Sequence, residues 1–204
     1  MARVDAVIFD LGNVLVFHDN ELLYRRLAER AGTTPAVVRG ALTEPDLFSA
    51  LNRGLLDADG IRHAVGGALG VALAPDEFTA LWCCHFQVNH AVLPLVERLV
   101  GRVRLLLLSN TNVVHTAYLR PRLPLLERFD HLLFSHDLGL VKPEEAFYRA
   151  ALARADARPE RTAFFDDVPE FVAAARALGI HGYVFYDLAT FIRDLAELGL
   201  LDEP

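Results

Sequence analysis

Several features that would point to a particular class of protein are missing from this sequence. Basic residues are not in excess: the formal net charge is −7 at pH 7, which argues against a general nucleic-acid binder because such proteins need a basic surface to displace counterions from phosphates. No apolar run is long enough to cross a bilayer, and the first residues lack a signal-peptide pattern. We therefore expect a cytoplasmic protein whose partners include neither nucleic acid nor a membrane.

Cysteine is scarce and closely spaced. The two cysteines, Cys83 and Cys84, are adjacent, which suits neither an ordinary disulfide nor a Cys-x-x-Cys redox or metal site, so we expect buried, reduced thiols. Four histidines lack metal-ligand spacing and are interpreted as surface or hydrogen-bonded side chains: His18, His63, His85 and His90. With 53% hydrophobic and 23% charged residues among 204, the chain can form one large domain or a core with a smaller insertion.

An apolar run over residues 7–16 carries a single carboxylate, Asp10, into a Gly-Asn turn. Runs of this kind, bounded by turn residues, are typical of strands buried on both faces of a parallel sheet. Asp10 would then lie at the carboxyl end of the strand, where open α/β sheets bind their ligands. Asp10 is therefore a candidate nucleophile, although an Asp in this position is also typical of a helix cap or turn.

Residues 17–89 have helical patterns and no convincing strand. A start signal at Thr34-Pro35 follows the first helix, and helices are expected over 21–29, 45–52, 59–69 and 75–87. Because helices this short are marginal alone, we expect them to pack together as a bundle. An apolar stripe near the end of this region is interpreted as bundle core rather than as a cofactor site: Phe78, Leu81, Trp82, Cys83 and Phe86.

From residue 90 helices and strands alternate, which is typical of a doubly wound parallel sheet. Strands are expected over 103–108, 131–134, 161–165 and 182–185, and helices over 91–100, 144–153, from Pro169 onward, and over 188–198. The sequence therefore predicts an α/β fold with two domains. A core domain comprises residues 1–16 and 90–204, and a helical domain comprises the inserted residues 17–89.

Polar side chains follow several of these strands. Ser109-Asn110 ends one strand, Lys142 follows another, and Asp166-Asp167 ends a third. Each alone could be a cap, a turn residue or a solvated lysine, but in a parallel sheet all would meet Asp10 at one edge. Carboxylates that lie this close need compensating cations, and hard oxygen ligands suit Mg²⁺. The set fits phosphoryl transfer, which requires positioning and charge neutralisation, and a carboxylate nucleophile would form an aspartyl-phosphate.

The order of these motifs resembles that of the haloacid dehalogenase-like phosphohydrolases over nearly the whole chain. Residues 9–14 resemble motif one, 108–112 motif two, 141–143 motif three and 165–167 motif four, and the insertion resembles the helical cap of that family. The phrases Asp-Leu-Gly-Asn-Val and Ser-Asn-Thr-Asn look like the bacterial α-D-glucose-1-phosphate phosphatase branch. The resemblance implies a Rossmann-like core and a Mg²⁺-dependent phosphatase that hydrolyses a small phosphorylated metabolite, such as a sugar phosphate, through an aspartyl-phosphate intermediate.

The resemblance also implies a role for each motif residue. Asp10 would be the nucleophile and a Mg²⁺ ligand, with Lys142 as the second catalytic residue. The other metal ligands would be the backbone carbonyl of Gly12 and the carboxylate of Asp167, with Asp166 as a water-mediated partner. The phosphoryl group would be held by three residues: Ser109, Asn110 and Lys142.

One position departs from the common pattern of that family. Most of its phosphatases have a second Asp two residues after the nucleophile as general acid/base, and here that residue is Gly12. Water, or a group such as Asp19, would then have to move the proton. Three alternatives stay open: a haloacid dehalogenase, which works without metal; a receiver-type phospho-acceptor domain; and an inactive protein that binds a phosphorylated ligand. Nothing in the sequence indicates an oligomeric state.

Overall fold

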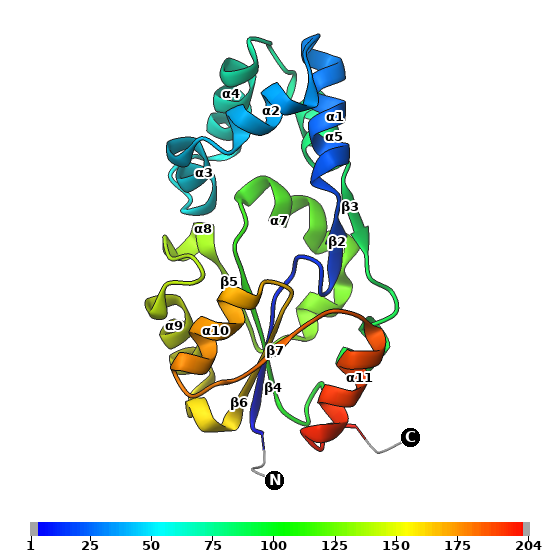
Figure 1. Cartoon of the computed structure of the whole chain (residues 1–204), viewed down its shortest axis with the longest axis vertical. Coiled ribbons are helices and arrows are strands. Elements are labelled where there is room, and N and C mark those ends of the chain that lie inside the picture. Colours follow the sequence, from blue (N-terminus) through cyan, green and yellow to red (C-terminus); the bar gives the residue numbers. More distant parts are fainter. Residues whose placement is uncertain (1–3, 202–204) are drawn as a thin grey trace.

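Five parallel strands form the central sheet of the computed structural model, which describes residues 4–201 (Figure 1). The strand order is β5-β4-β1-β6-β7. The central strand β1 (Ala6–Phe9) pairs with β4 (Arg104–Ser109) and β6 (Thr162–Asp166), while β5 (His131–Phe134) and β7 (His181–Val184) form the edges. The chain order thus reverses at β1, which confirms the predicted doubly wound sheet and places a crevice at the carboxyl ends of β1, β4 and β6.

The apolar runs form strands because both faces of the sheet are covered. Alternate residues of β1 belong to different clusters: Val7 and Phe9 to one, Ala6 and Ile8 to the other. The first cluster packs under α6 (Leu93–Glu97) and α11 (Leu188–Glu197), the second under α9 (Glu145–Ala155) and α10 (Pro169–Ala177). Figure 1 shows α9 and α10 on one side of the sheet and α11 on the other. Burying a Phe or Ile side chain stabilises the fold by about 1.5–3 kcal/mol, so these positions set the strand register.

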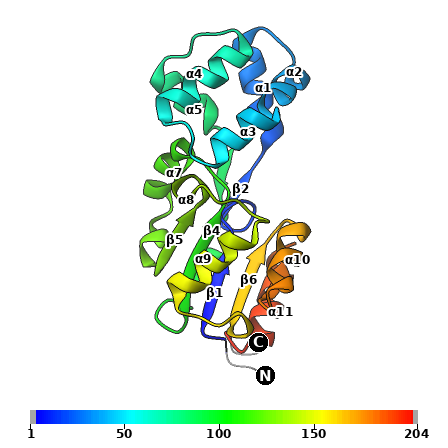
Figure 2. The ribbon, with the colours of Figure 1, turned by 90° about the vertical axis from the view of Figure 1, so that its left-hand side faces the viewer.

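Five of the helices between β1 and β4 form a bundle with an apolar cluster of its own. They are α1 (Asn20–Ala31), α2 (Pro35–Leu42), α3 (Pro45–Asn52), α4 (Ala58–Leu69) and α5 (Pro75–Trp82). The cluster includes Leu27, Val38, Ile61, Val65 and Phe78. Figure 2 shows the bundle as a group beyond the carboxyl ends of the strands. The expected bundle is therefore present, and we propose that residues 17–89 are a cap domain on a core of residues 1–16 and 90–204.

The expectation that residues 17–89 contain no strand is wrong. Two antiparallel strands, β2 (Val16–His18) and β3 (Phe86–Val88), connect the bundle to the core. The helix expected over 75–87 consequently ends at Trp82. Each strand has three residues, too few for a period of two to be recognised in the sequence. The two strands are stable because they pair with each other. Pairing between distant segments cannot be recognised from the local sequence of either strand.

Shorter helical elements complete the chain. The helix expected over 91–100 is confined to α6, and two helices were not anticipated: α7 (Val113–Leu119) and α8 (Ser135–Leu138). Three 3₁₀ turns span Arg120–Arg122, Pro124–Arg128 and Pro159–Arg161. Both cysteines are free thiols, as expected; Cys83 is buried, whereas Cys84 is only half-buried. None of the helices within residues 4–201 is long and apolar enough to cross a membrane. The first three residues, where no signal peptide was expected, lie outside the described residues.

Candidate active site

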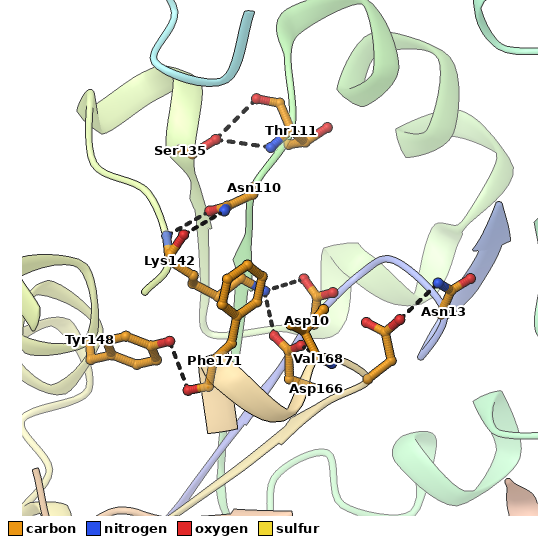
Figure 3. A network of polar contacts seen from close by, with 11 residues as sticks. Asp10, Asn13, Asn110, Thr111, Ser135, Lys142, Tyr148, Asp166, Val168 and Phe171 are labelled. Atoms are coloured by element: carbon orange, nitrogen blue, oxygen red, sulfur yellow. Dashed lines mark hydrogen bonds and ion pairs between the residues drawn. The ribbon is translucent and has the colours of Figure 1, made fainter. Parts of the chain in front are cut away.

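A buried lysine bridges two carboxylates at the carboxyl edge of the sheet (Figure 3). Asp10 directly follows β1, Asp166 ends β6, and Lys142 lies in the loop before α9. The Lys142 Nζ is 2.7 Å from Asp10 Oδ1 and 2.6 Å from Asp166 Oδ2. Parallel pairing of β1 with β6 brings the two carboxylates to the same edge, and the three side chains are almost completely buried.

Burial and charge oppose each other in this triad. The pKa of Asp10 is raised to about 7: burial raises it most, the Lys142 ammonium lowers it, and the Asp166 carboxylate raises it. Burial alone would disfavour the charged form of Lys142, but the carboxylates of Asp10 and Asp166 raise the pKa of Lys142 above its usual value. The lysine therefore stays charged and supplies a fixed positive charge beside Asp10.

A third carboxylate, Asp167, completes a cluster that could hold a metal ion. Oxygen atoms of Asp10, Asp166 and Asp167 lie within 4.8 Å of one another. Both oxygens of Asp166 already accept bonds, one from Lys142 and one from the Val168 N–H at 2.8 Å. Three carboxylates against one ammonium leave an excess of negative charge that a divalent cation would neutralise. The all-oxygen donor set fits a hard cation such as Mg²⁺, so the predicted ligands are compatible with that metal.

Asn13 holds Asp167 from the turn after β1. Its Nδ2 donates to Asp167 Oδ2 at 2.8 Å (Figure 3), and its Oδ1 accepts from the His18 N–H at 3.3 Å. The residue has a positive φ of 51°, which Asn adopts more readily than most side chains. Asn13 is part of motif one, but the sequence analysis predicts no role for it. The Gly-Asn turn is the sequence feature that could have indicated one.

Gly12 lies beside an imidazole. A Cβ at Gly12 would be 3.2 Å from His18 Cε1, 3.3 Å from His18 Nδ1 and 3.6 Å from Asp10 Oδ2, so His18 borders the space in which a side chain at position 12 would lie. Asp19, considered above as a proton-moving group, is exposed and caps α1 by accepting from the Leu22 N–H. The suggestion for Asp19 stays a prediction, and this cap argues against it. Capping fixes its carboxylate outside the lining of the site.

The loop after β4 supplies the remaining predicted residues. Ser109 is buried at the strand end. Asn110 is bonded to the backbone of Lys142 in both directions: its Oδ1 accepts from the Lys142 N–H at 2.8 Å and its Nδ2 donates to the Lys142 carbonyl at 2.9 Å (Figure 3). Ser135, which the sequence did not single out, joins the same loop by accepting from the Thr111 N–H at 2.9 Å. The Asn110 side chain thus positions the lysine, and its contact with a phosphoryl group stays a prediction.

These groups open into one cavity of about 370 Å³. The floor comprises the strand-end residues, including all the predicted site residues except the wholly buried Asp166: Asp10, Gly12, Ser109, Asn110, Lys142 and Asp167. The bundle, β2, β3 and α7 supply the opposite wall, with Leu23 and Phe48 among its apolar members. The structure thus brings the predicted residues together on the floor. We call the partly apolar wall opposite them the roof.

The interpretation of His85 is corrected in part, and that of Trp82 and Phe86 is confirmed and extended. His85 was expected to be exposed or hydrogen-bonded. It is buried, lines the cavity and interacts with the Trp82 backbone, but its Nδ1 is unpaired. Trp82 and Phe86 belong to the bundle core as expected, and they also line the cavity. The positions of these three side chains depend on how α5 and β3 pack against α7. Sequence periodicity does not predict this packing. His63 and His90 are exposed, as expected.

The sequence model of one protein family, haloacid dehalogenase-like hydrolase, matches residues 4–179 of this chain. The chain belongs to this family. It is 26% identical over 185 residues to a D-ribitol-5-phosphate phosphatase of Bacteroides thetaiotaomicron, covering 87% of this chain and 89% of the relative. It is also 26% identical over 199 residues to a sesquiterpene phosphatase of Aspergillus oryzae, covering 95% of each.

A solved structure from the same family has the same fold. An enzyme of Bacteroides thetaiotaomicron, crystallised with magnesium and inorganic phosphate, superposes with a TM-score of 0.84 at 22% identity, covering 93% of this chain and 100% of the other. Membership of this family removes the receiver-type phospho-acceptor domain from the alternatives.

Proposed function

We propose that this hydrolase is a Mg²⁺-dependent phosphatase that cleaves a small phosphorylated metabolite, such as a sugar phosphate. The observation that carries the proposal is the bridge from the Lys142 Nζ to Asp10 and Asp166, with the Asp167 carboxylate in the same cluster. A phosphoryl group carries its charge on several oxygens, and this site offers fixed positive charge next to a nucleophile. Two relatives that match most of the chain are phosphatases, which supports the same reaction.

In the proposed reaction the Asp10 carboxylate attacks phosphorus. The bond between phosphorus and the ester oxygen breaks, this oxygen leaves as an alkoxide that takes a proton from water to form the alcohol, and the phosphoryl group becomes attached to Asp10. Water then attacks the phosphorus of this aspartyl-phosphate, which releases inorganic phosphate and restores the carboxylate. The Lys142 ammonium orients Asp10 through its 2.7 Å contact and offsets negative charge throughout.

The other site residues hold the groups that react. Asp10, the Gly12 carbonyl and Asp167 would bind Mg²⁺, and Asp166 would anchor Lys142 and the turn through Val168. When bound, Mg²⁺ would neutralise charge on the phosphoryl oxygens. Ser109 and the Asn110 loop would bind the phosphoryl group from the other side. Because position 12 is glycine, the departing oxygen receives no proton from a carboxylate two residues after the nucleophile.

The test is the release of inorganic phosphate from a panel of phosphate esters, measured with Mg²⁺ and after chelation with EDTA. We expect turnover of at least one small ester with Mg²⁺, and loss of that turnover in EDTA that is restored by added Mg²⁺. Release of halide from 2-haloacids in EDTA, without phosphate release, would favour the haloacid dehalogenase. Absence of both activities from folded protein that binds inorganic phosphate in calorimetry would favour the inactive binding protein.

A further inference from the structure

Three buried side-chain nitrogens near the roof of the cavity lack hydrogen-bond partners: Trp82 Nε1, His85 Nδ1 and His115 Nε2. Within residues 4–201 no other buried side-chain nitrogen or oxygen is unpaired. All three residues line the cavity that contains Asp10 and Lys142. A buried polar atom without a partner is costly and rare in native proteins. Three in one cavity wall indicate that a ligand or water completes their bonds.

The bonds of Asn112 define the proton on His115. The Asn112 Oδ1 accepts from the backbone N–H groups of Val114 and His115, both at 3.1 Å. Its Nδ2 is therefore the group 3.1 Å from His115 Nδ1, and an amide nitrogen can only donate. The Nδ1 atom accepts this bond, so the proton of the neutral ring is on Nε2. By geometry, neither Trp82 Nε1 nor the His115 Nε2–H has a hydrogen-bond acceptor, although the Trp82 backbone carbonyl lies near the His115 ring and weakly favours its charged form.

Both histidines are neutral near pH 7. The pKa of His85 is lowered to about 4, chiefly by burial and also by the charge of a protonated His18, with a smaller opposing effect of Asp19. Burial also lowers the pKa of His115 to about 3, helped by His85. The Trp82 backbone carbonyl favours the charged forms only weakly. This wall therefore offers no positive charge to a second anionic group and instead suits neutral hydroxyls, which both donate and accept.

Aromatic packing holds the three nitrogens in place. The rings of Trp82 and His115 stack with centroids 5.4 Å apart at 24°. The ring of His85 lies 4.1 Å from that of Phe86 and 5.6 Å from that of His115, centroid to centroid. Asn112 caps α7, so the loop that ends β4 at Ser109 also positions His115. The groups that face the phosphoryl group and those that face the rest of the substrate are thus connected through one short segment.

We infer that Trp82, His85 and His115 form a subsite for the hydroxyl groups of a neutral polyol or sugar leaving group. This inference rests on the proposed phosphatase function and adds the residues that select the substrate. The N–H groups of Trp82 and His115 donate to substrate oxygens, and His85 Nδ1 pairs with a hydroxyl as donor or acceptor. The flanking rings pack against the carbon chain. A purely apolar leaving group would keep these nitrogens unpaired, and a site built this way rejects such an analogue.

The test compares ribitol 5-phosphate with n-pentyl phosphate, which has the same number of carbons and no hydroxyl. The measured quantity is the ratio of their kcat/KM values with Mg²⁺, in the wild-type protein and in H115F, H85F and W82F. Each Phe keeps an aromatic ring in the wall and removes the nitrogen. We expect the wild type to favour ribitol 5-phosphate, and each substitution to lower the ratio about tenfold, chiefly through the KM of ribitol 5-phosphate. H63F, at an exposed histidine outside the cavity, is the matched control and should keep the wild-type ratio.

The outcomes separate this inference from the function on which it rests. Failure to release phosphate from either ester or from p-nitrophenyl phosphate would overturn the proposed function itself. Turnover with equal ratios in the wild type and folded variants would overturn the subsite and assign the nitrogens to bound water. A preference for pentyl phosphate would overturn it in favour of an apolar leaving group. If the substitutions prevent folding, product inhibition of the wild type decides, because free ribitol should inhibit more strongly than 1-pentanol.

Discussion

The two walls of the cavity differ in charge and in hydrogen bonding. On the floor, Lys142 pairs with Asp10 and Asp166, and Asn13 pairs with Asp167, so charged groups are buried but satisfied. On the roof, His85 and Trp82 are neutral and leave nitrogens unpaired. A wall whose charged groups are already hydrogen-bonded is preorganised for a reaction in which negative charge shifts between atoms of the substrate. A neutral wall with open donors is suited to choosing among substrates.

The walls also differ in what holds them in place. The floor residues follow parallel strands, whose register fixes where each carboxylate lies. The roof residues come from the end of α5, the start of β3 and the first turns of α7. Changes in the floor should therefore affect the chemical step for every substrate. Changes in the roof should affect which substrate is used.

The largest effect is expected from Asp10→Asn, which tests whether the floor does the chemistry. The amide keeps the size of the side chain but removes the nucleophile and a metal ligand, so kcat should fall at least about 10³-fold for every ester. Phosphate release and thermal unfolding should be measured together. The melting curve should stay cooperative, which would separate loss of chemistry from loss of fold. Activity within tenfold of wild type would contradict a nucleophilic Asp10.

A smaller effect distinguishes the two neighbouring acids of the floor. Asp167→Ala should raise the Mg²⁺ concentration for half-maximal activity by at least about tenfold, the scale seen when metal-site partners are lost. Asp166→Ala should change this concentration less and lower stability more, because it removes a partner from the buried Lys142 and frees the Val168 N–H. Mg²⁺ titrations and urea unfolding of both variants provide the measurements. Identical titration curves would argue against Asp167 as the direct ligand.

Position 12 lies where the two walls meet, and its substitution should change the dependence on the leaving group. Without a nearby acid, esters with good leaving groups should be cleaved best, since lost general acid catalysis costs typically about 10²–10⁴-fold. Gly12→Asp should make the plot of log kcat/KM against leaving-group pKa shallower. The new Cβ would be 3.2 Å from His18, so the gain should be larger in Gly12→Asp combined with His18→Ala. A slope in the parent as shallow as in the variants would mean that another group already donates the proton.

The floor could be predicted from sequence because each of its signals is local. The apolar run before Asp10 indicates a buried strand, and the Asp166-Asp167 pair follows another such run. Parallel topology then brings the ends together without further information. The helix Pro45–Asn52 was predicted with its observed bounds because a proline at its first position marks the start.

The roof could not be predicted in the same way. β2 and β3 have three residues each and are stable through pairing, and α7, which carries His115, is a seven-residue helix. The importance of His85 comes from its burial and from an unpaired atom, both of which depend on packing between distant segments. A histidine that is neutral and unpaired has the same sequence signature as one that is exposed. Tertiary contacts alone distinguish them.

The last and smallest effect is a pH dependence of stability that belongs to the roof. The folded protein holds His85 and His115 neutral, with pKa values of about 4 and 3 against an ordinary value of 6.5. Between pH 6.5 and 4 the unfolded chain therefore binds more protons than the folded one, so stability is lost as pH falls through this window. Each histidine should contribute a loss of about 2 kcal/mol between pH 7 and 5.

The measurement is urea unfolding of the metal-free protein across this range for the wild type, H115F and the control H63F. The raised pKa of Asp10 has the opposite effect, but it is common to all three proteins and cancels in their differences. The unfolding free energy of H115F should fall less steeply with decreasing pH than that of the wild type, by about 1.4 kcal/mol per pH unit, which corresponds to one proton. H63F should follow the wild type, because His63 is exposed. Parallel pH profiles for H115F and the wild type would mean that His115 takes up its proton in the folded state. The roof would then carry positive charge below pH 6.5. In that pH range the two walls would no longer differ in having one charged and one neutral surface.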